Sequence, residues 1–487
     1  MNQTGITIIG LGPGDPMLIT REAWGVLNDV KEIYLRTSEH PAVDGFPKGL
    51  IIHSFDYLYE ENIEFEQVYE EIVETVLDLG HRDSGVVYGI PGHPLIAEAT
   101  SPEIIRRAQR DGIPVKILEG MSFFEAAFGL LGIDPLPQTS LIDGLELAIS
   151  HHPPFPPSAP VLIAQIYSAA VASNVKLTLM SVYPDNHPVQ LIHGAGTAGA
   201  YVESVELYKI DRSKKIGLRT VLYVPALSSG SSFENFQEII ARLRAPDGCP
   251  WDREQTHLTL RPFLLEETYE VLAALDNEDQ TALEEELGDL MLQIVLHAQL
   301  ASEYGDFSMV DVLEKISEKL IRRHPHVFGD LEVKDQQTVV ENWQKLKLAE
   351  HEGEQEFNGV LRGVSPALPA LVQAETFQQR VNRVGFDWPD IQGVFKKIDE
   401  ELKEVRKAKT PVEFEDEIGD LLFSVVNLAR WKNIDAESAL RAANGKFRQR
   451  FEELEAAARK QGKELVELNL DAMDQLWNEA KKTNNLK

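Results

Sequence analysis

The sequence has little cysteine and little positive charge. Its 487 residues include a single cysteine, Cys249, which excludes disulfide bonds within the chain and a zinc site built from several thiolates. Lys and Arg number 47 against 78 Asp and Glu, for a formal net charge of −31. This charge repels phosphate backbones and anionic lipids at long range, so we expect no stable nucleic-acid or membrane partner. Such a surplus of carboxylates suits divalent cations instead.

Long apolar runs are missing as well. The sequence has no uninterrupted stretch of about 18 apolar residues, the length that a membrane-spanning helix requires. The N-terminus has no basic leader before its apolar run at residues 6–9, so we expect no export signal. With a single cysteine and no such signal, a cytoplasmic protein is expected. At roughly 150 residues per domain, the length corresponds to about three domains.

Short β-branched runs alternate with glycine and proline up to about residue 225, and helical patterns separate several of them. This alternation predicts an α/β region over residues 1–228. Residues 151–160 contain five prolines. We interpret this segment as a stiff connector that splits the region into two lobes, in preference to a Pro-rich recognition segment.

After a serine-rich stretch at residues 228–232 the strand patterns end, and the sequence becomes rich in Glu, Leu, Ala, Lys and Gln. This change predicts a linker at 229–239 and an all-α helical bundle after it. One helix start is clear, with Thr410 as N-cap, Pro411 at the first helical position and Glu413 completing a capping box. The apolar stripe of this helix has the spacing of one buried face: Ile418, Leu421, Leu422, Val425, Leu428 and Ala429.

The helical half contains an internal repeat, which predicts one unit at 240–355 and a second at 356–487. The pattern Glu-Glu-x-x-Glu followed by Glu-x-x-Asp occurs in both, at offsets of 134 and 131 residues. Its acids are Glu266, Glu267, Glu270, Glu286 and Asp289 in copy one and Glu400, Glu401, Glu404, Glu417 and Asp420 in copy two. Basic and aromatic residues follow in each copy, namely Lys319, Arg323, Trp343 and Lys347, then Lys446, Arg450, Trp477 and Lys481.

The spacing of the acids predicts a metal site in each copy. Residues three apart lie on one face of a helix, so four carboxylates from two antiparallel helices can meet. All-oxygen ligation with high negative charge selects Mg²⁺, with Mn²⁺ as the alternative ion. A single Glu-x-x-Glu is usually a solvated helix face, but two copies of the whole pattern argue against that interpretation. The predicted ligands are Glu267, Glu270, Glu286 and Asp289, and Glu401, Glu404, Glu417 and Asp420.

The residues around the acids point to a polyphosphate ligand. In so acidic a protein, the two Lys and Arg pairs are suited to neutralise phosphates whose oxygens bridge to metal ions. The tryptophans Trp343 and Trp477 either stack on a base or fill the core. Gly288 and Gly419 lie between their acids, where glycine costs about 1 kcal/mol relative to alanine, so we expect a packing or close-approach reason at both, of which close helix contact is one.

Residues 240–487 resemble the MazG family of nucleoside triphosphate pyrophosphohydrolases, whose hallmark is this acidic pattern. The resemblance implies hydrolysis of a nucleoside triphosphate to a monophosphate and pyrophosphate in a homodimer. It implies that metal ions activate water, that Glu266 and Glu400 accept its proton or support the site, and that the Lys and Arg pairs clamp the pyrophosphate. Lys396 and Lys397 precede the acids of copy two, where copy one has Phe263 and Leu264. We therefore favour copy two as the active one, with Lys397 on the substrate.

Glycine motifs mark the first half. The run Gly10-Leu-Gly12-Pro13-Gly14-Asp15 fails as a dinucleotide fingerprint, because Asp15 stands where the third glycine belongs and Pro13 removes an N–H donor. A literal Gly-x-Gly-x-x-Gly at residues 194–199 is a lone match, which is weak evidence for NAD binding.

Residues 3–225 resemble the tetrapyrrole methylase family of S-adenosylmethionine-dependent methyltransferases. The supporting runs are Gly10 to Asp15, Val87-Tyr88-Gly89-Ile90-Pro91-Gly92-His93-Pro94, Glu119-Gly120-Met121-Ser122 and Thr220 to Pro225. The resemblance implies two α/β lobes with S-adenosylmethionine between them, and candidate cofactor-binding residues Gly12, Pro13, Gly89, Pro91, Gly92, His93 and Ser122. Many members have Gly-Asp-Pro where this chain has Gly92-His93-Pro94, so the acid of that motif is absent here. Turn geometry alone explains these glycines equally well.

Three hypotheses follow. The first is a Mg²⁺-dependent nucleoside triphosphate pyrophosphohydrolase fused to a methylase-like domain, so the expected fold is multidomain, a two-lobed α/β domain followed by an all-α tandem bundle. The second makes the chain primarily a methyltransferase whose helical half is an accessory. The third makes the helical half a dimerisation bundle whose acids are surface charge.

Overall fold

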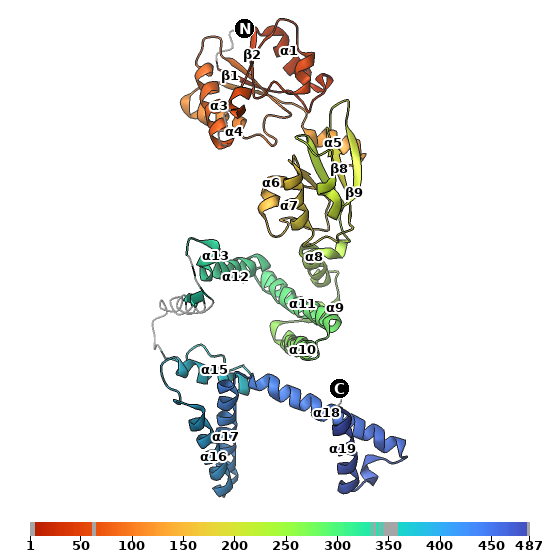
Figure 1. Cartoon of the computed structure of the whole chain (residues 1–487), viewed down its shortest axis with the longest axis vertical. Helices are drawn as coiled ribbons and strands as arrows, with labels where there is room; N and C mark the ends of the chain where they lie inside the picture. The colour runs from red at the N-terminus through yellow and green to blue at the C-terminus, as the bar shows by residue number, and fades with distance from the viewer. Residues whose placement is uncertain are drawn as a thin grey trace. The chain divides into compact units, whose positions relative to one another are not determined.

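The computed structural model describes residues 5–60, 65–331 and 359–484, together with 333, 335, 338, 339, 342 and 343. It divides into two compact units, Met1–Cys249 and Pro250–Lys487 (Figure 1). The domain boundaries that the sequence suggests near residues 228 and 240 stay a prediction. Among the described helices, none combines the length and the apolar character needed to cross a bilayer.

The first lobe of unit one is a five-stranded parallel sheet in the order β3-β2-β4-β1-β5. The central strands β1 and β4 are buried at every position, as expected for a parallel sheet covered on both faces. Its strands are β1 (Ile6–Gly10), β2 (Glu32–Leu35), β3 (Ile51–Ser54), β4 (Val86–Ile90) and β5 (Val115–Leu118). Its helices are η1 (Pro16–Leu18), α1 (Arg21–Asp29), η2 (Pro41–Gly45), α2 (Asp56–Glu60), α3 (Phe65–Gly80) and α4 (Thr100–Asp111).

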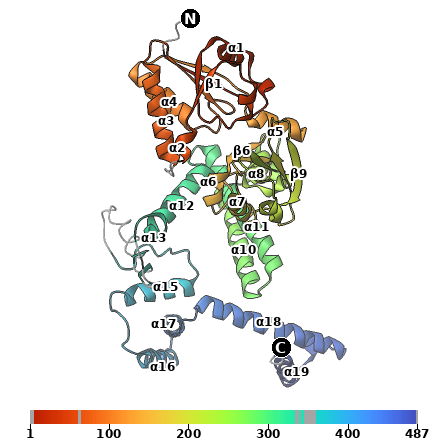
Figure 2. The ribbon, with the colours of Figure 1, turned by 45° about the horizontal axis from the view of Figure 1, so that its top comes forward.

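Side chains alternate between the two faces of this sheet, and each face has its own core. Ile8 and Tyr88 contribute to the core that includes α3 and α4, which lie side by side (Figure 2). Ile9 and Val87 contribute to the second core, which includes Leu27 of α1. The period of two in the strands therefore produces the three-layer arrangement.

The second lobe is a mixed sheet in the order β6-β7-β10-β8-β9, in which β6 and β7 run parallel and the other pairs are antiparallel. Its elements are α5 (Phe123–Leu131), β6 (Ser140–Asp143), α6 (Gly144–Ile149), β7 (Val161–Ala164), α7 (Ala169–Leu179), β8 (Pro188–His193), β9 (Tyr201–Glu206), η3 (Leu207–Arg212) and β10 (Thr220–Val224). η4 (Ser229–Ser231) and α8 (Phe233–Arg244) follow, and Ser158 donates a hydrogen bond to the α8 N-cap Ser232 (2.8 Å). The two-lobed α/β prediction is confirmed.

The proline-rich segment 151–160 lies inside the second lobe, between α6 and β7. Its Phe155 is buried in the core of that lobe. The sheets change earlier, between β5 and β6, so the lobes do not divide where the prolines suggested. Prolines stiffen a connection because their φ is fixed, and this property marks a rigid loop whether or not a lobe boundary lies there.

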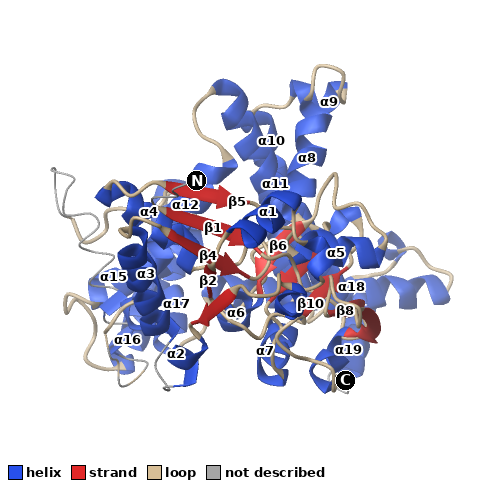
Figure 3. Cartoon of the chain, turned by 90° about the horizontal axis from the view of Figure 1, so that it is seen from above, coloured by secondary structure: helices blue, strands red, loops and turns tan. Residues whose placement is uncertain are grey.

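Unit two is helical at every described element, and all the named strands belong to unit one (Figure 3). Its elements are α9 (Pro250–Glu254), α10 (His257–Asp276), α11 (Gln280–Tyr304), α12 (Met309–Arg323), α13 (Pro325–Phe328), α15 (Ala370–Asn382), α16 (Ile391–Lys407), α17 (Pro411–Trp431), α18 (Ala436–Lys460), η5 (Leu465–Glu467) and α19 (Leu470–Asn484). The helix start at Thr410 has the predicted capping box, in which Thr410 accepts from the Glu413 N–H (3.2 Å) and Glu413 accepts from the Thr410 N–H (3.2 Å). The all-α prediction for this half is confirmed.

Candidate functional site

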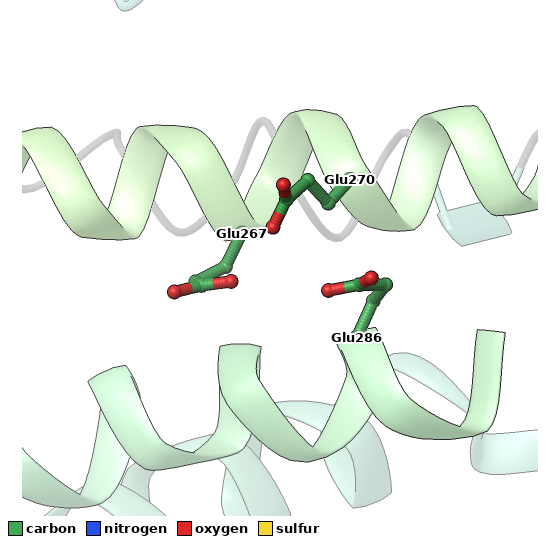
Figure 4. A group of neighbouring side chains, drawn as sticks. All are labelled: Glu267, Glu270 and Glu286. Carbon is green, nitrogen blue, oxygen red and sulfur yellow. The ribbon is translucent and has the colours of Figure 1, made fainter. Parts of the chain in front are cut away.

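The acids of copy one meet between α10 and α11, which pack against each other. Glu267 and Glu270 extend from α10 and Glu286 from α11, and the three side chains converge on the gap between the helices (Figure 4). One carboxylate oxygen of each lies within 4.8 Å of the others. A helical spacing of three thus brings two acids onto one face, and the antiparallel neighbour supplies the third.

The carboxylates of copy one repel one another. Desolvation and the nearby Asp289 and Glu270 raise the pKa of Glu267 above its ordinary value. Desolvation and Glu270, with further repulsion from Glu285 and Asp289, raise the pKa of Glu286. Asp289 is therefore close enough to act on the cluster, although the group of three does not include it. A divalent cation among these oxygens removes the repulsion, and an all-oxygen set fits a hard ion such as Mg²⁺.

In copy two the acids form two overlapping groups on α16 and α17. Glu400, Glu401 and Glu404 make one group, and Glu401, Glu417 and Asp420 make the other, each with ligand atoms within 4.8 Å. All four predicted ligands of this copy therefore lie in groups that share Glu401.

Glu401 is the most buried of these acids. Its exposed fraction is 2%, and its Oε2 is buried without a hydrogen-bond partner. A buried carboxylate oxygen is costly to leave unpaired, so this atom is suited to bind a cation. Repulsion from neighbouring acids, after desolvation, also raises the pKa of Glu417.

Lys397 pairs with the acids of copy two. Its Nζ lies 2.6 Å from Glu401 Oε1 and 2.9 Å from Glu400 Oε1, and these hydrogen bonds raise the pKa of Lys397. By the offset of 134 residues, the matching position in copy one is Phe263. At this position copy two therefore has a lysine that pairs with its acids, whereas copy one has a phenylalanine. Lys396 lines a depression on the same helix, with Glu400 and Glu404.

The cations and tryptophan predicted in copy two lie on α18 and α19. Lys446 and Lys481 are exposed, and Arg450 has a buried Nε without a hydrogen-bond partner. Trp477 packs against the core of these two helices, with its ring 5.2 Å from that of Phe447. In the part of the chain that the structure describes, no ion pair joins Lys446 or Arg450 to the acids.

In copy one, the Arg323 guanidinium lies over the ring of Trp343, 5.2 Å from its centre. Lys319 is exposed on α12, and Lys347 lies outside the described residues. Glu266 neighbours the acidic cluster and contributes to the raised pKa of Glu267. These contacts leave the predicted roles of the five residues as predictions.

Neither glycine between the acids makes a close contact within the chain. A Cβ built on Gly288 or Gly419 has nothing within 4 Å. The predicted close helix contact is therefore absent from the described residues of the chain, because the two helices of each pair face each other through their acids and not through these glycines.

In unit one, the glycine-rich strand ends lie where parallel sheets bind ligands. β1 and β4 are neighbours, and the connections after them leave toward opposite edges of the sheet, which makes their carboxyl ends a topological switch point. Gly12 and Gly92 bridge these ends, with N–H···O distances of 3.2 and 2.8 Å. A Cβ on Gly10 would lie 2.6 Å from the Gly92 oxygen, so backbone approach requires glycine there.

The other candidate residues of this site have local roles in the structure. Gly89 belongs to β4, and Pro91 with Gly92 begins the loop after it. His93 Nδ1 accepts a hydrogen bond from the Leu95 N–H (3.0 Å). Ser122 is the N-cap of α5 and accepts from the Phe124 N–H (3.1 Å).

The two glycine loops of unit one pack on each other. A Cβ on Gly196 would collide with Pro13, and one on Gly14 would lie 2.6 Å from Thr197 Cγ2. Asp15 donates its N–H to the Gly196 oxygen (2.8 Å). Gly196 of the literal Gly-x-Gly-x-x-Gly therefore serves the contact between the two glycine loops, which accounts for this glycine without a dinucleotide.

Sequence reasoning missed a buried polar network beside these strand ends. Arg36, directly after β2, pairs with Glu98, whose side chain is 2% exposed, and it donates to Tyr69 (3.1 Å) and Tyr59 (3.3 Å). Glu98 also accepts from the N–H of Thr100 at the start of α4 (2.8 Å). A charged residue at the carboxyl end of a buried strand was the available signal.

His40 was missed as well. It is buried, its Nδ1 has no hydrogen-bond partner, and burial together with Arg219 lowers its pKa to about 4. The imidazole lies next to Gly12, whose backbone hydrogen bond acts in the opposite direction and raises the pKa.

Comparison with known proteins bears on the helical unit first. The model of the MazG nucleotide pyrophosphohydrolase domain matches residues 255–328 and 392–454. The nucleoside triphosphate pyrophosphohydrolase/pyrophosphatase MazG of Thermotoga maritima is 46% identical over 253 residues, which are 52% of this chain and 97% of that protein. The chain belongs to the MazG family. The nucleoside triphosphate pyrophosphohydrolase of Escherichia coli K12 is 43% identical over 50% of this chain and 95% of its own length.

The first half of this MazG family chain matches a second model, that of the tetrapyrrole (corrin/porphyrin) methylases, over residues 5–211. The uncharacterized protein YabN of Bacillus subtilis is 39% identical over 98% of both chains. Both resemblances noted in the sequence are thus confirmed. The chain combines a MazG-like pyrophosphohydrolase domain, present as two copies, with a tetrapyrrole methylase-like domain.

Proposed function

We propose that this chain is an enzyme that hydrolyses nucleoside triphosphates to monophosphate and pyrophosphate with Mg²⁺, or Mn²⁺ in its place. The observation that carries the proposal is the meeting of carboxylates from antiparallel helices, once in each copy of the repeat. The activity for which the Thermotoga maritima and Escherichia coli relatives are named supports it.

In this mechanism Glu401, Glu404, Glu417 and Asp420 hold the ion in copy two, and Glu267, Glu270, Glu286 and Asp289 hold it in copy one. When bound, the ion supplies Lewis-acid polarisation of the α-phosphoryl group and a more acidic water. Glu400, exposed beside Glu401, accepts the proton of the attacking water, and Glu266 does so in copy one.

The substrate's phosphates are held by cations of the chain. Lys397, which pairs with Glu401, would compete with a bound ion for this carboxylate and would then be available to a phosphate oxygen. Lys446, Arg450 and Lys481 in copy two, and Lys319, Arg323 and Lys347 in copy one, hold the pyrophosphate. Trp477 packs in its core cluster, which supports a structural role over base stacking.

Pyrophosphate release from a panel of canonical and damaged triphosphates tests this proposal. Glu270→Ala removes one metal ligand from copy one, and Glu404→Ala removes one from copy two. The activity of the double variant is expected to fall by about 100-fold or more. Glu284→Ala with Glu415→Ala serves as the matched control, because these exposed acids lie outside the groups on α11 and α17, the second helix of each pair. Full turnover in the double ligand variant would contradict the metal assignment.

For unit one we propose binding of S-adenosylmethionine at the carboxyl ends of β1 and β4, and transfer of its methyl group to an acceptor. The bridged Gly12 and Gly92 at a switch point support this site. Calorimetric titration of the full chain with S-adenosylmethionine is expected to give binding that Gly92→Val abolishes. No heat at high ligand concentration would reduce the unit to a scaffold and remove methyl transfer as the chain's main activity.

We also propose a cytoplasmic homodimer that forms through the helical unit. The apolar stripe of α17 leaves Ile418, Leu422 and Val425 between 46% and 53% exposed. An apolar stripe left half in water favours a second copy of the same helix as its cover. Light scattering on the protein as it elutes from a size-exclusion column measures its mass. A monomer at micromolar concentration would contradict this arrangement. The high negative charge supports the absence of a nucleic-acid or membrane partner.

A further inference from the structure

The two helices of copy one hold a second group of metal-ligating side chains. His257 is the first residue of α10, and His297 lies on α11. Their Nδ1 atoms are 2.8 Å apart, and their ring planes are parallel to within 1°. Neither residue belongs to the acidic cluster, which is about 15 Å farther along α10, at 1.5 Å for each of ten residues.

The short distance between the two Nδ1 atoms indicates where the lone pairs of the imidazole rings point. A hydrogen bond between two imidazole nitrogens requires a proton on one and a lone pair on the other, so both nitrogens are directed at one point between the rings. Imidazole nitrogens that converge in this way are ligands for borderline ions such as Zn²⁺, Ni²⁺ and Cu²⁺. When an ion binds at this point through both Nδ1 atoms, the proton of the hydrogen bond moves through solvent to the Nε2 of the ring that carried it, so both rings stay neutral.

Comparison of the two copies shows that the helix packing does not require histidine here. α16 begins at Ile391, ten residues before Glu401, just as α10 begins at His257, ten residues before Glu267. The offset of 131 residues places Leu428 at the position of His297. Copy two thus has two partly buried apolar residues where copy one has two imidazoles.

A third donor lies on the same face of α11. Gln293 precedes His297 by four residues, one helical turn, so both side chains share a face. Gln293 is 5% exposed, and its Oε1 is buried without a hydrogen-bond partner. Its counterpart in copy two is Ser424 by the same offset. Buried amide oxygens are ordinarily paired, so this unpaired oxygen is a second, independent sign of a ligand site.

We propose that His257 and His297, with the Oε1 of Gln293, form a transition-metal site in copy one that is separate from the acidic cluster. Its nitrogen donors select a borderline ion, whereas the carboxylates select hard ions such as Mg²⁺. A bound ion fastens the start of α10 to α11, the two helices that carry Glu267, Glu270 and Glu286. The site is independent of the proposed hydrolase activity.

The test is a calorimetric titration of the untagged full chain with Ni²⁺ in excess Mg²⁺, which occupies the carboxylates. We expect one Ni²⁺ per chain and a higher unfolding temperature with the ion. The double variant His257→Ile with His297→Leu installs the residues of copy two, whose helices pack with these side chains, so we expect it to fold. Its Ni²⁺ affinity is expected to fall at least tenfold. Should it fail to fold, His257→Gln alone, at an exposed helix start, is expected to show the same loss.

Two further measurements separate this site from adventitious binding. His324→Gln with His326→Gln is the matched control, because the Nδ1 of His324 already contacts the Leu320 oxygen (2.7 Å), and it is expected to keep wild-type affinity. The electron paramagnetic resonance spectrum of bound Cu²⁺ is expected to show coupling to two nitrogens. Wild-type affinity in the histidine variants, or no ion bound by the wild-type chain, would leave the pair as a plain hydrogen bond and overturn the proposal.

Discussion

At the residue scale, the two copies of one motif have different charge balances. In copy two a lysine neutralises part of the cluster, whereas the matching residue of copy one is Phe263. There desolvation, with repulsion from Glu270 and Asp289, raises the pKa values of Glu267 and Glu286. Identical motifs therefore need not bind an ion with equal strength, because the neighbouring turn of the helix sets the local field.

The raised pKa values predict how stability depends on pH. Glu267 and Glu286 hold their protons more strongly in the folded chain, so their contribution is favourable at low pH and is lost as pH rises through the raised folded values, which lie above the usual glutamate pKa of about 4.3. At pH 7 the ionised pair therefore costs stability. Mg²⁺ is expected to raise the unfolding temperature at pH 7 and to bind more weakly toward pH 5.

Thermal unfolding followed by circular dichroism, with and without Mg²⁺ at both pH values, checks this prediction. Glu267→Gln is expected to raise the unfolding temperature without the ion and to reduce the gain from it. An equal Mg²⁺ effect at pH 5 and pH 7 would count against the assigned cluster.

Lys397→Phe gives copy two the residue of copy one. We expect tighter Mg²⁺ binding at copy two, since the internal competitor for Glu401 is gone, and weaker nucleotide binding, since a phosphate ligand is lost. Calorimetric titrations with Mg²⁺ and with nucleotide measure the two affinities. They are made in chains that also carry Glu270→Ala, which removes a metal ligand of copy one. A change of both affinities in the same direction would refute the exchange of partners.

At the element scale, the helices are set by local signals. Thr410 caps α17 through its own side chain, as the sequence indicates. Thr410→Ala is expected to destabilise the helical unit by about 1 kcal/mol, the usual worth of an N-cap. Urea unfolding checks the value, and Thr410→Ser should restore most of it, because the hydroxyl is what the cap requires.

Gly288 and Gly419 test the assembly of these helices. With open space around each Cβ, alanine is expected to stabilise the single chain by about 1 kcal/mol through helix propensity. If a second copy packs against these positions, the same substitutions will instead weaken the dimer. Unfolding measured at two protein concentrations distinguishes the two results. An equal loss of stability at both concentrations would indicate a contact within the chain.

At the scale of the whole molecule, the chain divides into two units with separate cores. We expect each ligand to shift only the unfolding of its own unit, Mg²⁺ that of the helical unit and S-adenosylmethionine that of the α/β unit. Scanning calorimetry of the full chain measures both transitions. A shift of the α/β transition by Mg²⁺ would reveal coupling between the units.

The sequence by itself determined the two fold classes, the duplicated helical unit and the acids on each helix face. These properties are local, since strand alternation, helix periodicity, capping and a repeat are each contained in a few neighbouring residues. The comparisons confirm both families that the motifs indicated.

Only the tertiary structure decided which side chains meet. It joined Lys397 to Glu401, moved the lobe division ahead of the proline-rich segment, and paired Arg36 with Glu98 and His257 with His297. Each of these facts depends on the register of one element against another, and register is set by the summed packing of the core, which no short stretch of sequence contains.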